Sequence, residues 1–422
     1  MEKGLDAHRT LDAIWRIESP KLIAGLARVV RDVGVAEDLA QDAFVSAITQ
    51  WPEEGIPRNP GAWLMAVAKR RAIDRFRRED RLERKQEEIA RNGELHVPRD
   101  IKLDALDDDI GDDLLRLMFI ACHPVLAVDA RVALALRLLG GLTTAEIARS
   151  FLTSEPTIAQ RIVRAKRTLR EARVPFEVPS REERTERLSS VLEVIYLIFN
   201  EGYSATAGED VLRPELCEDA MRLGRVLAEL VPGEPEVHGL VALMELQASR
   251  SKARVGPSGE PVLLLDQDRG QWDHLLIGRG LAALERAEKS SAALGPYSLQ
   301  AAIAACHARS RTAAETDWAR IAALYDALAQ LIPTPVVHLN RAVAVGMAYG
   351  AAAGLELVDA LTSEPALVAY HLLPSVRGDL LVKLGRSSEA RAEFVRAASL
   401  ANSPRDRKLL LARAENCAPG RN

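Results

Sequence analysis

Apolar residues recur at intervals of three and four along most segments of this chain, a spacing that places them on one side of an α-helix. The segment VAEDLAQDAFVSAITQW, for example, puts Leu39, Ala43, Ile48 and Trp51 near one face and polar residues on another. Ala and Leu dominate, and only 4% of the 422 residues are aromatic, whereas β-sheets favour β-branched and aromatic residues. The sequence therefore predicts an all-α fold, and its length predicts about two to four domains.

The composition excludes several classes of protein. Hydrophobic residues make up 48% and charged residues 27% of the chain, with a net charge of −4, which is typical of a soluble globular protein. The four cysteines lie far apart without a CxxC pair, so we expect no disulfide framework, no metal site and no cofactor. No signal peptide is evident, and the longest uncharged stretch is shorter than the roughly 18 residues of a membrane span. We therefore expect a cytoplasmic protein without a membrane partner.

Residues 8–81 are expected to form the first domain. The segment GIPRNPGAW breaks the helical pattern, and Asn59 is placed to cap the next helix. That helix, AWLMAVAKRRAIDRFRR, carries an apolar stripe that includes Leu64 and Phe76, with arginines on the opposite side. Trp63 stands at its start, either as an anchor in the core or as an exposed stacking platform. Residues 82–113 lose the apolar rhythm, end in an acidic cluster and are expected to form a flexible linker.

Residues 114–175 carry the signature of a helix-turn-helix. Thr143 and Glu146 form a capping box that opens a short helix, and Ser154 caps the next one, TIAQRIVRAKRTL. In such a unit the first helix crosses the phosphate backbone and the second enters the major groove, where Arg reads guanine and Gln reads adenine. A solvated charged face is the alternative for so basic a helix. The candidate DNA contacts are Thr143, Thr144, Gln160, Arg161, Arg164 and Lys166.

From residue 180 onward helices alternate with turns rich in Pro and Gly. Pro333, Pro365 and Pro404 lie 32 and 39 residues apart, near the period of about 34 that is typical of tetratricopeptide (TPR) repeats. The clearest copy is LLPSVRGDLLVKLGRSSEARAEFVRAASLANSP. We therefore expect a helical extension over 180–290 and TPR-like repeats over 291–415, which would offer a concave groove to a partner.

The two basic units together resemble a known family. AEDLAQDAF followed by PGAWLMAVAKRRAIDRFRR resembles region 2 of bacterial sigma factors of the extracytoplasmic-function group, and LTTAEIARSF with TIAQRIVRAKRTL resembles their region 4. The resemblance covers residues 8–175, without the region 3 that this whole group lacks. IYLIFNEGYSAT is similar to the start of the large helical extension carried by one subgroup. The resemblance implies a non-enzymatic sigma factor that binds core RNA polymerase and promoter DNA.

The resemblance also implies roles for individual residues. Docking on the clamp coiled coil of core RNA polymerase is implied for Asp38, Leu39, Gln41 and Asp42. Capture of a flipped base of the minus-ten element is implied for Asn59 and Trp63. A cationic groove for the melted strand could be supplied by Lys69, Arg70, Arg71, Arg75 and Arg78. Recognition of the minus-thirty-five element is implied for Thr157, Gln160, Arg161 and Arg164, although Pro156 is unusual at that helix start.

Simple geometry is compatible with this interpretation. Promoter elements roughly 17 base pairs apart are separated by about 58 Å at 3.4 Å per step. A linker of about 30 residues can extend to roughly 100 Å. The extension is expected to regulate promoter engagement in cis, through contact with regions 2 and 4 or with polymerase, either by inhibiting or by assisting.

Other functions explain less of the sequence. A helix-turn-helix regulator with a ligand-sensing repeat domain leaves the basic helix at 63–81 unassigned, and a repeat adaptor ignores the first 175 residues. An enzyme is not expected, because no nucleophile–base arrangement, Gly-rich phosphate loop or HExxH is present. LLDQDRGQWD superficially resembles a calcium loop, but its glycine and terminal Glu are not at the required positions.

Overall fold

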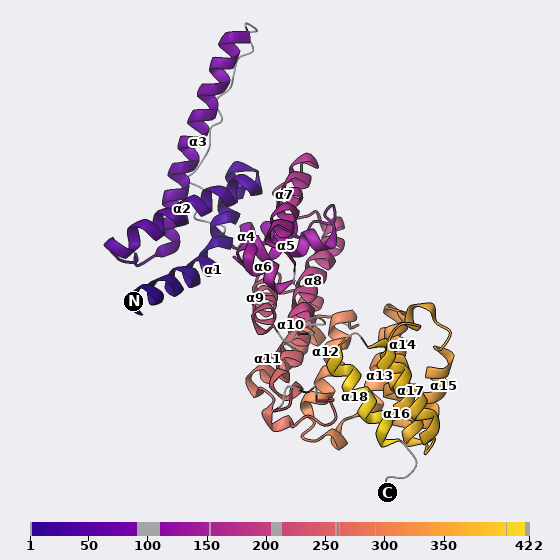
Figure 1. The fold of residues 1–422 in the computed structure, drawn as a ribbon. Coiled ribbons are helices and arrows are strands. Elements are labelled where there is room, and N and C mark those ends of the chain that lie inside the picture. Colours follow the sequence, from indigo (N-terminus) through magenta and orange to yellow (C-terminus); the bar gives the residue numbers. More distant parts are fainter. Residues whose placement is uncertain are drawn as a thin grey trace. The chain divides into compact units, whose positions relative to one another are not determined.

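A computed structural model describes residues 2–90, 110–151, 153–203, 213–257, 260, 262–291, 293–401 and 403–417. The elements over these ranges are α-helices and short 3-10 helices, which confirms the all-α fold (Figure 1). Contacts divide the chain into two compact units, Met1–Ile198 and Phe199–Asn422. None of the helices in the described ranges is both long and apolar enough to cross a bilayer.

The first unit begins with three packed helices: α1 (Glu2–Val30), α2 (Val33–Glu54) and α3 (Pro60–Ala90). Asp32 caps α2, because its Oδ1 accepts hydrogen bonds from the backbone N–H groups of Gly34 and Val35 at 2.8 and 3.0 Å. Ile48 was expected on the buried face of α2, but it is exposed and Ala47 is buried in its place. The core that joins the three helices includes Ile23, Leu26, Leu39, Ala43, Trp51, Leu64 and Ala68.

Helix α3 is longer than the sequence pattern predicts. The linker was expected to begin at residue 82, but the helix continues to Ala90, beyond the part that packs on α1 and α2 (Figure 1). The residues of this extension are mostly Leu, Glu, Arg, Lys and Gln, which favour a helix without needing an apolar stripe. The next helix begins at Ile110, so Asp112 and Asp113 are helical and do not belong to a linker. The intervening residues 91–109, with Asp107, Asp108 and Asp109, lie outside the described residues.

The second part of this unit is a small bundle of α4 (Ile110–Ala121), α5 (Val128–Leu138), α6 (Thr144–Ser150) and α7 (Glu155–Glu171). The capping box at the start of α6 is confirmed, since Thr143 and Glu146 each bond to the other's backbone N–H. Helix α7 is capped by the Ser154 side chain, with Pro156 in its first turn. The proline therefore does not displace the helix start, and α6 and α7 form the expected helix-turn-helix.

Helix α8 (Arg181–Tyr203) is bonded to α4, to α5 and to the turn between them. Arg187 donates to the carbonyl of Phe119 at 3.0 Å, and Ser190 donates to the carbonyl of Cys122 at 2.5 Å. Arg131 of α5 donates in turn to Ser190 at 2.5 Å. The contact boundary after Ile198 therefore falls inside α8, and not near residue 180, where the extension was expected to start.

The second unit is a succession of helices that pack on their neighbours along the chain. They are α9 (Pro214–Leu230), α10 (Pro235–Ala248), α11 (His274–Ser290), α12 (Pro296–Arg309), α13 (Trp318–Leu331), α14 (Pro335–Tyr349), α15 (Ala351–Ala360), α16 (Leu372–Lys383), α17 (Ser387–Leu400) and α18 (Pro404–Asn416). Short 3-10 helices occur at Ser251–Arg254 (η2), Arg269–Gln271 (η3), Ala313–Glu315 (η4) and Pro365–Leu367 (η5).

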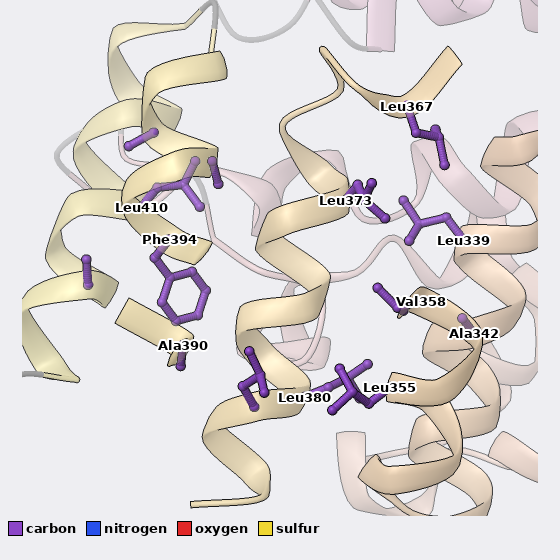
Figure 2. Packing of buried hydrophobic residues seen from close by; sticks show 14 of the residues in the cluster. Leu339, Ala342, Leu355, Val358, Leu367, Leu373, Leu380, Ala390, Phe394 and Leu410 are labelled. Atoms are coloured by element: carbon purple, nitrogen blue, oxygen red, sulfur yellow. The ribbon is translucent and has the colours of Figure 1, made fainter. Parts of the chain in front are cut away.

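Helices α14 to α18 share one apolar core. Figure 2 shows Leu380 of α16 beside Leu355 of α15, and Phe394 of α17 between Ala390 and Leu410. Helices α14 and α15 approach closely where glycines meet, since a Cβ on Gly354 would lie 2.7 Å from the Cα of Gly346. Consecutive antiparallel packing of this kind is compatible with TPR-like repeats, whose identification stays a prediction.

Candidate nucleic-acid interface

Helix α7 separates cleanly into a buried and an exposed side. Ile158, Ile162, Ala165 and Leu169 are buried against the rest of the bundle. This anchoring leaves Thr157, Gln160 and Arg164 on the exposed side of the same helix. The Oγ1 of Thr157 is 2.7 Å from the Oγ of the capping Ser154. A rigid helix that presents an amide and a guanidinium to solvent has the chemistry that reads base edges in a major groove.

The two other basic candidates on α7 are engaged within the first unit. The guanidinium of Arg161 lies 3.4 Å from the carboxylate of Asp129, which is itself well exposed. Lys166 forms an ion pair with Glu37, a carboxylate of α2 that is only 2% exposed. Arg161 can exchange its exposed partner for a phosphate at little cost, whereas Lys166 is held by a buried one.

The start of α6 is fixed by the capping box and by α1. Thr143 is exposed and Thr144 half-buried, and both lie in the first turn where the helix would meet a phosphate backbone. Glu146 accepts a hydrogen bond from Arg16 at 2.7 Å. Burial alone would raise the pKa of Glu146, but the hydrogen bonds from Thr143 and the charge of Arg16 outweigh it and lower the pKa.

The first part of α3 presents a row of cations next to an aromatic pair. Arg70, Arg75 and Arg78 are exposed, and Lys69 is half-buried. Arg71 is tied to α2, where it donates to Ser46 at 2.8 Å and lies 3.4 Å from the carboxylate of Asp42. A row of exposed cations of this kind has the charge that a groove for single-stranded nucleic acid requires.

The helix start of α3 holds both residues expected at the minus-ten element. The side chain of Asn59 accepts a hydrogen bond from the backbone N–H of Ala62 at 3.1 Å and so caps the helix. Trp63 is half-buried and packs edge-on against Trp51, with ring centroids 5.3 Å apart. Trp63 is therefore partly anchored by Trp51 and partly accessible, so a role as a stacking platform stays a prediction.

The expected polymerase-docking patch lies on the outward side of α2. Asp38 and Asp42 are exposed, and Gln41 is half-buried because it donates to Glu37 at 2.5 Å. Val45 lies one turn further and is 59% exposed. Leu39 was included in this patch, but it is buried in the core of the three helices and supports the patch from below. The accessible patch is therefore acidic with an apolar neighbour.

A network of ion pairs joins the first three helices to the helix-turn-helix. Its centre is Glu37, whose Oε1 accepts a hydrogen bond from Arg137 of α5 at 2.6 Å and whose other oxygen faces Lys166 of α7. Asp32, the cap of α2, accepts a hydrogen bond from Arg170 at 2.5 Å. Burial would raise the pKa of Asp32, but hydrogen bonds from Arg170 and the backbone N–H of Val35 outweigh it, so the pKa is lowered.

Further pairs extend this contact to the far end of α1. Arg28 of α1 lies 3.3 Å from Asp113 of α4, a carboxylate that is almost fully buried. Sequence reasoning missed these residues, because a Glu or Asp on a helix looks the same whether its partner is solvent or a distant arginine. One sequence feature could have predicted that Glu37 is buried: it lies beside Ala36 and Ala40 on the apolar side of α2.

No three His, Cys, Asp or Glu side chains of the described residues gather closely enough to hold a metal ion.

Three segments of the chain match models of known protein families. Residues 15–82 match the model of Sigma-70 region 2 and residues 116–169 that of Sigma-70 region 4. Residues 187–288 match a family of unknown function (DUF6596). No solved structure gives a significant match.

Several curated proteins are similar to the chain. An uncharacterized protein of Rhizobium meliloti is 42% identical over 396 residues, which are 91% of this chain and 90% of that protein. The ECF RNA polymerase sigma factor SigK of Mycobacterium ulcerans is 32% identical over 148 residues, which are 34% of this chain and 75% of SigK. The probable ECF RNA polymerase sigma factor SigI of Mycobacterium tuberculosis is 29% identical over 182 residues, which are 43% of this chain and 61% of SigI.

Proposed function

Because the chain belongs to the extracytoplasmic-function (ECF) group of RNA polymerase sigma factors, we propose that it binds core RNA polymerase and directs initiation at promoters with two separate DNA elements. As a sigma factor it is an initiation factor and not an enzyme. The observation that carries the proposal is that each matched segment presents its own accessible recognition surface, on α3 in one and on α7 in the other. A protein that binds core polymerase would act in the cytoplasm.

Each surface is proposed to bind a different partner. The exposed side of α7 would read the minus-thirty-five element through Thr157, Gln160 and Arg164, with Arg161 released from Asp129. Asn59 and Trp63 would hold a base of the melted minus-ten element, and the cations of α3 would follow the strand. The outward side of α2, with Asp38, Gln41 and Asp42, would dock on core polymerase.

The ion pairs between α2 and α7 suggest that the first unit must open before it engages a promoter. Elements roughly 17 base pairs apart are separated by about 58 Å along duplex DNA, whereas Glu37 and Asp32 hold α7 directly on α2. Phosphates and core polymerase would compete for the same cations and carboxylates. We infer that binding to both partners exchanges these internal pairs for external ones and frees Lys166 for the DNA.

We further propose that the second unit modulates this step in cis. Helix α8 begins on α4 and α5, beside the helix-turn-helix, and its last residues belong to the second unit. The second unit is thus covalently attached directly after region 4, so that it could act on regions 2 and 4 or on polymerase from the same chain. Whether the second unit restrains or assists initiation is decided by comparing the full chain with a truncation.

The test is run-off transcription with purified core polymerase on fragmented genomic DNA. The structure sets the truncation after Tyr203, because α8 covers α4 and α5 and should be kept whole. Specific initiation by either protein supports the sigma factor assignment of these surfaces, and the difference between them measures the effect of the second unit. Duplex binding by α7 without core binding or specific initiation would favour a helix-turn-helix regulator with a sensor domain. Equal activity of both proteins would contradict modulation in cis.

A further inference from the structure

A pocket of about 160 Å³ lies within the second unit, between α10, α12 and α13. Its apolar wall is formed by Leu243 and Leu246 of α10 and by Ile303 of α12. Polar residues also line the pocket, among them Arg250 and His307. An apolar wall facing a few convergent polar groups is the usual composition of a site for a small molecule.

Arg250 lines the pocket, and Arg254 and Arg269 lie near it, with the charge of Glu315 acting on Arg269. Within the described residues, Arg250, Arg254 and Arg269 have no carboxylate at ion-pairing distance. Arg250 donates to the side-chain oxygen of Gln247 at 2.5 Å, and Arg254 stacks over the ring of Tyr203 at 3.8 Å. Burial, and for Arg254 also the charge of Arg250, lowers the pKa of Arg254 and Arg269. Half-buried guanidinium groups without an anion favour the binding of one.

In the part of the chain that the structure describes, two nearly buried side chains of the pocket wall each have a nitrogen without a hydrogen-bond partner. Trp272 is 4% exposed and its indole Nε1 is unpaired, and His307 is 9% exposed and its Nδ1 is unpaired. Burial, followed by the charges of Arg250 and Arg269, lowers the pKa of His307 to about 4. The imidazole is therefore neutral at neutral pH and carries one N–H donor. Buried polar atoms are paired in most proteins, so the indole N–H of Trp272 calls for an acceptor, and so does the Nδ1 of His307 in the tautomer that protonates it.

Hydrogen bonds between residues around the pocket fix the positions of its polar side chains. Gln247 accepts from both Arg250 and the hydroxyl of Tyr203, the latter at 3.2 Å. Arg269 donates to the carbonyls of His307 and Ser310 at 2.8 and 2.9 Å, which fixes the end of α12. A site with this much internal support loses little conformational freedom when a ligand binds.

We propose that this pocket binds a small organic carboxylate through Arg250, with its apolar part against Leu243, Leu246 and Ile303. The guanidinium offers two parallel donors that match the two oxygens of a carboxylate. Trp272, His307 and Gln300 supply further donors in the wall. A cavity of about 150 Å³ accommodates a benzene-sized molecule, so the ligand is limited to a short acid or to the last residue of a peptide. The apolar wall disfavours inorganic phosphate.

Isothermal titration calorimetry of the full chain tests this site. Benzoate and isovalerate represent free acids, benzamide is the uncharged analogue of benzoate, and inorganic phosphate controls for general anion binding. A tripeptide ending in Phe is compared with its C-terminal amide, which separates a peptide source from a free acid. The variants are Arg250→Gln and Trp272→Phe, and the matched control is Arg286→Gln, which removes an exposed arginine of α11 in the same unit.

We expect at least one carboxylate probe to bind the wild-type chain and Arg286→Gln equally. Arg250→Gln should weaken that binding at least tenfold, and Trp272→Phe, which keeps the ring but removes the donor, should weaken it several-fold. If Arg250→Gln does not fold, the binding measured with Trp272→Phe tests the carboxylate site instead. Binding of no carboxylate, equal binding of benzamide or phosphate, or unchanged binding by the variants would overturn the proposal. Because neither DNA nor polymerase is present, such a failure leaves the proposed function untouched.

Discussion

Glu37 is a buried carboxylate of α2 that forms ion pairs with basic residues of two other helices. It is almost fully buried and meets Arg137 at 2.6 Å and Lys166 of the recognition helix. Removal of one partner from a buried ionic network leaves the remaining charges without compensation. The residue also joins regions 2 and 4, so its substitution bears on stability and on opening together.

Substitution Glu37→Gln keeps the shape of the side chain and removes its charge. We expect the free energy of unfolding of the first unit to fall by about 3–5 kcal/mol, measured by urea denaturation. The control is Glu171→Gln, at an exposed i, i+4 pair with Arg167, which should change stability by less than about 0.5 kcal/mol. Equal effects of the two substitutions would show that the network around Glu37 is no stronger than a surface pair.

His307 makes the stability of the second unit sensitive to pH. Its pKa is lowered to about 4, first by burial and then by the charges of Arg250 and Arg269, whereas a histidine of the unfolded chain titrates near 6.5. Between these values the unfolded chain binds a proton that the folded chain does not, so stability falls as the pH drops from about 6.5 to about 4.

The loss should be on the order of 2–3 kcal/mol across that window. Differential scanning calorimetry between pH 7.5 and 4.5 measures it, and His307→Gln should flatten the pH dependence of the second unit. His274→Gln, at an exposed position in the same unit, serves as the control and should keep the dependence. A steep dependence that survives in His307→Gln would place its cause elsewhere.

At the scale of elements, α7 combines a buried apolar stripe with an exposed polar side, which we propose reads the promoter. If it does, Arg164→Ala should weaken promoter binding by the holoenzyme by about 1–3 kcal/mol, because it removes an exposed guanidinium and no core contact. Arg286→Ala removes the same charge from the second unit and should leave the affinity unchanged. Fluorescence anisotropy with promoter duplex provides the measurement, together with the thermal midpoint of each variant. If Arg164→Ala leaves the affinity for the promoter duplex unchanged, the exposed side of α7 is better explained as a charged surface that contacts only solvent.

The start of α3 should matter for strand separation and not for duplex binding. Trp63→Ala should reduce formation of the open complex, since stacking on an aromatic ring contributes about 1–3 kcal/mol per base. Trp63→Phe retains a stacking surface and the contact with Trp51, and should recover much of the effect. 2-Aminopurine fluorescence at the minus-ten element reports the open fraction. If Trp63→Ala forms the open complex normally, Trp63 has a packing role only and does not stack on a base.

Helix α8 should behave as part of region 4. A chain ending at Phe176 lacks the residues that cover α4 and α5, including Ser190 and Arg187, whereas a chain ending at Tyr203 keeps them. We expect the longer truncation to unfold at a clearly higher temperature in a thermal melt followed by circular dichroism. Equal midpoints would mean that the packing of α8 contributes nothing to the bundle.

Over the whole molecule, local signals predicted more than long-range ones. The caps at Asn59, Thr143 and Ser154 and the apolar stripe of α7 are encoded within one or two helical turns, and the structure confirms them. The helical residues 82–90 were missed because polar helix formers leave no apolar rhythm. The burial of Glu37 and the pocket near Arg250 depend on partners far away in the sequence, which no local pattern reveals.

The central claim is that one chain uses two separate surfaces to engage a promoter together with core polymerase. A hydroxyl-radical footprint of the reconstituted holoenzyme, on a promoter found by run-off transcription, tests it most directly. We predict two protected blocks roughly 17 base pairs apart, about 58 Å along the duplex, with the upstream block weakened by Arg164→Ala and the downstream block by Trp63→Ala. A single protected block that forms equally well without core polymerase would contradict the account.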